Sequence, residues 1–121
     1  MSINEPAVGS AIPKLDGPVG YTLAVLVDAD ADQIVTVTVQ GLAVPRVGER
    51  LNFDLAGQQM SVKIVDVAHW FFEPRDDPNH REIIVTAQPL DVDQAVARQL
   101  LDPETLAQWC ARLATVTPTT T

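Results

Sequence analysis

The stretch MSVKIVDVAHWFF, from Met60 to Phe72, decides the fold of this chain. It is the longest apolar run in the sequence, and its apolar residues recur with the period of two that is typical of a β-strand. Val62 and Ile64 hold one phase of this alternation, whereas Val65 begins the other. A strand can bring both phases to one face only through an extra residue, so we expect a β-bulge between Ile64 and Asp66. The alternative is a strand that is buried on both faces.

Four further segments around this run have strand periodicity, at residues 21–27, 35–39, 51–55 and 83–88. Their links are short enough for hairpins and carry turn residues such as Pro45, Gly48 and Gly57. The sequence therefore predicts a mainly β (α+β) fold built on a small five-stranded antiparallel barrel, SH3-like or OB-like, because closure removes exposed strand edges. The alternative is a curved open antiparallel sheet covered by helices.

After Pro89 the apolar period changes to one near 3.6, which predicts helix. Asp102-Pro103-Glu104 is a helix start, with Asp102 as N-cap and proline at the first helical position. A residue before proline avoids the helical conformation, so we expect two short C-terminal helices and not one long helix. The second helix places four residues on one face: Leu106, Trp109, Cys110 and Leu113.

A chain of 121 residues is expected to form one domain. We divide it into a flexible N-terminal tail (1–20), the barrel (21–90), a helical segment packed on the barrel or on a partner (91–114) and a disordered tail (115–121). The first tail is interrupted by proline and glycine, and the second is rich in threonine.

Composition excludes several classes of function. Sixteen acidic and eight basic side chains give a net charge of −8, which argues against a nucleic-acid partner or an anionic membrane surface. The chain also has no apolar run long enough for a membrane helix. With one cysteine and no export signal, we expect a cytoplasmic protein.

The polar loop after the long strand could hold a divalent metal. Its four candidate ligands are His69, Asp76, Asp77 and His80. Their spacing matches no metal motif. The alternative to metal binding is that His69 is partly buried and that His80 is solvated. Asp28, Asp30 and Asp32 are spaced as in the opening of a calcium loop, but the required glycine and glutamate are missing, so we interpret them as an acidic hairpin tip. No catalytic residue or cofactor is assigned.

Three adjacent aromatic residues, Trp70, Phe71 and Phe72, follow His69. Neighbours on a strand point to opposite faces, so one side of this cluster must be covered by the chain's own helices, by another subunit, or by a partner or ligand. The expected interaction surface consists of Trp70, Phe71, Phe72, Leu106, Trp109 and Leu113. This predicts a non-enzymatic interaction or assembly module that is a homo-oligomer or binds a protein partner. The alternative is a small-molecule or metal-dependent enzyme that uses His69, His80 and nearby carboxylates.

The segment Val44-Pro45-Arg46-Val47-Gly48-Glu49, continuing through Leu51-Asn52-Phe53, Gly57 and Val62 to His69, resembles small bacterial and phage β-barrel domains of unassigned function. These share a Pro-x-Val-Gly-Asp/Glu turn before a hairpin with a bulged second strand. The resemblance covers about a quarter of the chain. It implies a barrel fold and a bacterial or phage origin, and it implies no activity.

Overall fold

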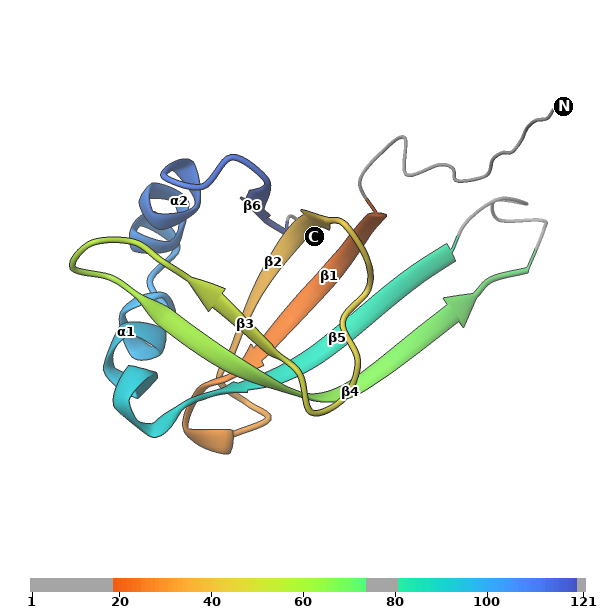
Figure 1. Cartoon of the computed structure of the whole chain (residues 1–121), viewed down its shortest axis with the longest axis horizontal. Helices are drawn as coiled ribbons and strands as arrows, with labels where there is room; N and C mark the ends of the chain where they lie inside the picture. Colours follow the sequence, from red (N-terminus) through yellow and green to blue (C-terminus); the bar gives the residue numbers. More distant parts are fainter. Residues whose placement is uncertain (1–18, 74–80, 120–121) are drawn as a thin grey trace, which may run out of the picture.

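The computed structural model describes residues 19–73 and 81–119, which form a curled six-stranded sheet with two short α-helices at one end (Figure 1). The strands are β1 (Val19–Leu26), β2 (Ile34–Gly41), β3 (Arg50–Phe53), β4 (Met60–Phe71), β5 (Arg81–Pro89) and β6 (Val116–Pro118). The helices are α1 (Gln94–Gln99) and α2 (Pro103–Ala111), with 3-10 turns η2 (Val27–Ala29) and η3 (Asp91–Asp93). The predicted mainly β class and the two C-terminal helices are confirmed.

The sheet is open, with the strand order β3-β4-β5-β1-β2-β6. The five predicted strands all form, and each pairs with its neighbour in a meander except at one place. Within the described residues no strand ladder joins β2 to β3, and β6 pairs with β2 there instead. A closed five-stranded barrel is therefore not what the described residues form, and the alternative of a curved open sheet is the better prediction.

The expectation of purely antiparallel pairing is wrong in one place, because β1 and β5 are parallel. The reason lies in the odd number of strands. When five strands that alternate in direction curl until the first meets the fifth, those two run the same way. The other ladders, β1 with β2, β3 with β4, and β4 with β5, are antiparallel as predicted.

The predicted β-bulge is confirmed. The ladder between β4 and β5 shifts register between Ile64 and Asp66, so that Ile64 lies opposite Ala87 and Asp66 lies opposite Thr86. Val65 is the extra residue and is 40% exposed. On the other edge of β4, the backbone N–H of Gly48 donates to the Ile64 carbonyl oxygen, and the backbone N–H of Ile64 donates to the Glu49 carbonyl oxygen.

The core lies on the inner side of the curl. Alternate residues of β1, β2, β4 and β5 are buried there, and α1 and α2 close one end of it. The largest side chain in this core is Trp109 of α2, which is 1% exposed. The chain breaks between the helices as predicted, since Asp102 is extended and its carboxylate accepts a hydrogen bond from the Thr105 backbone N–H at 2.9 Å.

The C-terminal tail predicted from residue 115 needs correction. Val116–Pro118 form β6, and the carbonyl oxygen of Thr115 accepts a hydrogen bond from the Gln40 backbone N–H at 2.9 Å. A three-residue strand carries too little alternation to be detected in sequence. At the other end, β1 begins at Val19, and the rest of the expected N-terminal tail lies outside the described residues.

Candidate functional site

Trp70, Phe71 and Phe72, which we call the aromatic end, lie where β4 runs beyond the core. Their side chains are 52%, 75% and 40% exposed. In Figure 1 the helices lie at one end of the molecule and the outer ends of β4 and β5 at the other. The expectation that the chain's own helices cover the aromatic end is therefore wrong for the described residues.

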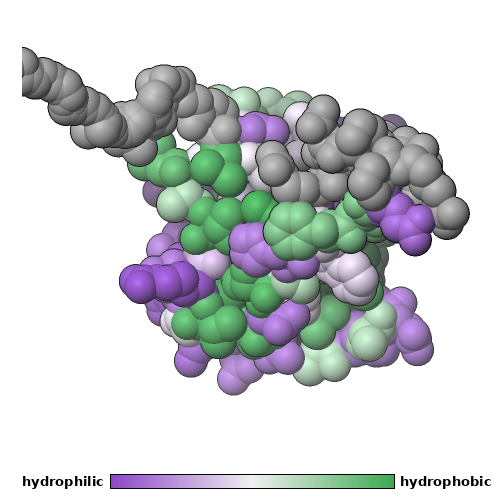
Figure 2. All heavy atoms as spheres, turned by 90° about the vertical axis from the view of Figure 1, so that its right-hand side faces the viewer, coloured by the Kyte–Doolittle hydropathy of each residue, from purple (hydrophilic) through white to green (hydrophobic). Residues whose placement is uncertain are grey.

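The aromatic end presents apolar surface on both faces of β4. Val67 packs against the core, and Phe71, four residues later, lies on the same face of β4. Trp70 lies on the opposite face and pairs across the ladder with Glu82. Viewed toward this end, Figure 2 shows apolar surface interspersed with polar side chains. Large apolar side chains exposed together are typical of an interaction surface.

The same part of β4 also has an open strand edge. β3 pairs with β4 from Met60 to Lys63. From Val65 to Phe71, β4 pairs with β5 alone among the described residues, so the backbone groups on its other edge have no strand partner there. Open edges of this kind can pair with another chain. The exposed rings of the aromatic end thus lie at the end of a strand, β4, that has β5 as its one strand partner from Val65 to Phe71 among the described residues.

The other three members of the expected interaction surface, which belong to α2 and the segment after it, lie elsewhere. Trp109 is buried, its ring centroid is 5.1 Å from that of Phe53, and its indole Nε1 donates to the Gln58 carbonyl oxygen at 3.0 Å. Leu106 and Leu113 pack against the core. The structure therefore does not bring these three residues to the aromatic end. Cys110 is buried beside them, and burial raises the pKa of its thiol, which opposes nucleophile chemistry.

The metal candidates are not assembled by the described residues. His69 is exposed on β4 and pairs with Ile83. Asp76, Asp77 and His80 lie outside the described residues. Among residues 19–73 and 81–119, no three His, Cys, Asp or Glu side chains lie close enough together to hold a metal ion.

The acidic turn between β1 and β2 is fastened to α1. Arg98 donates two hydrogen bonds to the carboxylate of Asp28, at 2.7 and 2.8 Å, and these hold the pKa of Asp28 below its ordinary value. The Asp30 side chain accepts from the backbone N–H of Asp32 at 2.9 Å. Hydrogen bonds within the protein account for the turn, as expected for an acidic hairpin tip.

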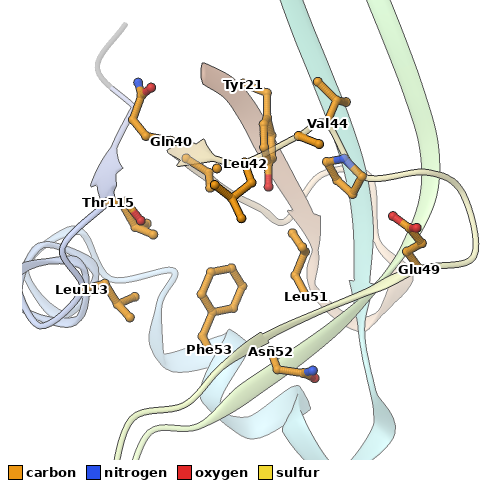
Figure 3. Close-up of a pocket in the computed structure, with 15 residues that line it drawn as sticks. Tyr21, Gln40, Leu42, Val44, Glu49, Leu51, Asn52, Phe53, Leu113 and Thr115 are labelled. Atoms are coloured by element: carbon orange, nitrogen blue, oxygen red, sulfur yellow. The ribbon is translucent and has the colours of Figure 1, made fainter. Parts of the chain in front are cut away.

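The structure also contains a pocket of about 450 Å³ that the sequence analysis missed. It lies where the curled sheet fails to close, between β2 and β3, and the segment after α2 forms one of its walls. Figure 3 shows Leu51 and Phe53 of β3, Leu42 and Leu113 around a common space. The sequence carried no signal for it, because Leu51, Phe53 and Leu113 also pack in or against the core and Leu42 lies in the loop after β2.

Tyr21 of β1 points into this pocket (Figure 3). The residue is 5% exposed, and burial raises the pKa of its hydroxyl. No hydrogen bond to that hydroxyl is formed by the residues that the structure describes. Buried hydroxyl groups are normally paired, so this one is unusual.

Comparison of the chain with protein-family models, with curated proteins and with solved structures gives no match. In the described part of the chain, no helix has both the length and the apolar character needed to cross a membrane.

Proposed function

We propose that this protein is a non-enzymatic assembly module of a bacterial or phage system, and that it self-associates through the aromatic end. The observation that carries the proposal is the exposure of Trp70, Phe71 and Phe72 on strands whose other residues build the core. Each exposed ring is large enough to contribute substantially to an interface, and tryptophan is the side chain most enriched among residues that dominate binding.

The geometry supports association between two copies of the chain. The aromatic end projects away from the helices, so a second copy can approach it without contacting them. The open edge of β4 beyond Ile64 offers backbone groups that pair best with another extended strand. A second copy supplies both an edge and three rings, so it satisfies both features at once.

The test is the mass of the protein in solution as a function of concentration, measured by sedimentation equilibrium. We expect a mass above the 13.1 kDa of one chain. Trp70→Lys removes the indole, and its cation lies opposite Glu82, which keeps the strand pair compatible with folding. We expect this change to weaken self-association about 30-fold.

The matched control is Val92→Lys. Val92 is 86% exposed in η3, near the helices, and this change adds the same charge far from the aromatic end. It should leave the association unchanged. A protein that stays monomeric at all concentrations, or equal weakening by both variants, contradicts self-association through the aromatic end.

No specific observation favours the alternative that this protein is an enzyme. His69 is the described member of its histidine pair; it is exposed on β4 and does not line the Tyr21 pocket.

A further inference from the structure

The pocket beside Tyr21 is built by both borders of the gap in the sheet. β1 and β2 contribute one wall, and the edge strand β3 contributes another. The loop from Leu42 to Pro45 and the segment from Leu113 to Val116 supply the rest. A volume of about 450 Å³ falls within the range of small-molecule sites.

The lining of this pocket is mainly apolar, and its polar side chains belong to Tyr21, Gln40, Glu49, Asn52 and Thr115. Leu51, Phe53 and Leu113 line it, and the hydroxyl of Tyr21 is directed among them (Figure 3). Tyr21 is buried, with 5% of its surface exposed. Its hydroxyl has no hydrogen-bond partner among the described residues. A buried hydroxyl without a partner is costly, and a ligand oxygen would satisfy it.

The charges around the pocket select against an anion. Apart from Tyr21, Glu49 is the ionisable residue of the lining. Its carboxylate already accepts hydrogen bonds from the backbone N–H and the guanidinium of Arg46, at 2.8 and 3.4 Å. Among the described residues, no lysine, arginine or histidine lines the pocket, so an anionic ligand would lose its hydration without gaining a cation there.

We propose that this pocket binds an uncharged small molecule with an apolar body of about ring size and one oxygen that pairs with the Tyr21 hydroxyl. Trp70, Phe71 and Phe72 are not among the residues that line this pocket, so the proposal does not depend on self-association.

The test uses three probes of similar size: acetophenone, ethylbenzene and benzoate. Each is titrated into the protein while the backbone amide signals are followed by two-dimensional NMR. We expect acetophenone to shift the signals of lining residues such as Leu51 and Leu113. Benzoate should bind at least tenfold more weakly, because its charge is not compensated. Absence of acetophenone shifts in the lining overturns the proposal.

Tyr21→Phe tests the hydroxyl. It should weaken acetophenone binding about fivefold, the value of one ordinary hydrogen bond, and leave ethylbenzene binding unchanged. If both probes weaken equally, the hydroxyl serves only the structure and its proposed role is wrong.

Gly41 allows the pocket itself to be blocked. Its backbone lies outside the left-handed region, and a Cβ added there would stand 3.6 Å from the Tyr21 ring, an ordinary contact. Gly41→Ala should therefore preserve binding, whereas the longer side chain of Gly41→Leu should abolish it. Equal acetophenone binding by the two variants contradicts the assigned location.

One competing occupant is the Trp70 indole of a second copy. Acetophenone binding that appears only in Trp70→Lys would show that the pocket is filled by another copy, and it would overturn the small-molecule proposal. Conversely, loss of acetophenone binding with an unchanged concentration-dependent mass would leave the proposed self-association standing.

Discussion

The indole Nε1 of Trp109 donates a hydrogen bond to the carbonyl oxygen of Gln58 at 3.0 Å, which fastens α2 to the turn between β3 and β4. Phe53 packs its ring edge-on against the same indole. This contact joins the last helix to the first edge of the sheet. The two tryptophans therefore have different roles, since Trp109 stabilises the core and Trp70 is exposed.

We expect Trp109→Phe to lower the free energy of unfolding by about 2 kcal/mol, because it leaves a cavity and removes the partner of the Gln58 carbonyl. Urea denaturation at low protein concentration measures this change. Trp70→Phe is the matched control and should alter stability by less than about 0.5 kcal/mol, since Trp70 is 52% exposed. Equal effects of the two variants would show that Trp109 is not held as described.

Ala29 has a φ of 57°, in the left-handed region that non-glycine residues rarely adopt. We expect Ala29→Gly to stabilise the protein by about 0.5 kcal/mol, because relief of this strain exceeds the added entropy of the unfolded chain. Ala31, two residues later, lacks a positive φ, so Ala31→Gly should destabilise it by about the same amount. Thermal unfolding of both variants measures the difference. Destabilisation by Ala29→Gly contradicts the turn geometry.

The sequence predicted most of what depends on local pattern. The change of phase between Ile64 and Val65 predicted the β-bulge, and Asp102-Pro103 predicted the break between the helices. Strand order is different, because alternation shows which face of a strand is buried and not which strand lies beside it. The parallel pairing of β1 with β5 and the open border between β2 and β3 therefore emerged only from the structure.

The candidate site was predicted in part for the same reason. Trp70 and Trp109 both lie in apolar patterns, and sequence does not tell which pattern meets the core. The Tyr21 pocket was beyond prediction, because it is formed by residues from four separate segments at the place where the sheet stays open. Its apolar members Tyr21, Val39 and Phe53 have the pattern of ordinary core residues.

The stability of the protein should fall at alkaline pH. Burial raises the pKa of Tyr21 above its ordinary value of about 10, so folding favours the protonated phenol. Stability is therefore unaffected by Tyr21 below about pH 10 and decreases as the pH rises from there toward the raised pKa of the folded state. Cys110 acts in the same direction from a lower pH, because burial also raises its pKa. Unfolding is best measured in a Cys110→Ala background.

In that background Tyr21→Phe should remove the remaining alkaline loss of stability. Tyr21 is the single tyrosine of the chain, so the absorbance of tyrosinate reports its titration directly. A midpoint at or below pH 10 in the folded protein would contradict burial of the hydroxyl.

Salt should strengthen the proposed self-association. Each copy carries a net charge of −8, so two copies repel one another, whereas the contacts proposed at Trp70, Phe71 and Phe72 are apolar. Raising sodium chloride from 0.1 to 1 M shortens the screening length from about 10 to 3 Å and suppresses this repulsion. We expect the dissociation constant from sedimentation equilibrium to fall about three- to tenfold. If salt instead weakens the association, ion pairs hold the interface, and the aromatic end is not its main contact.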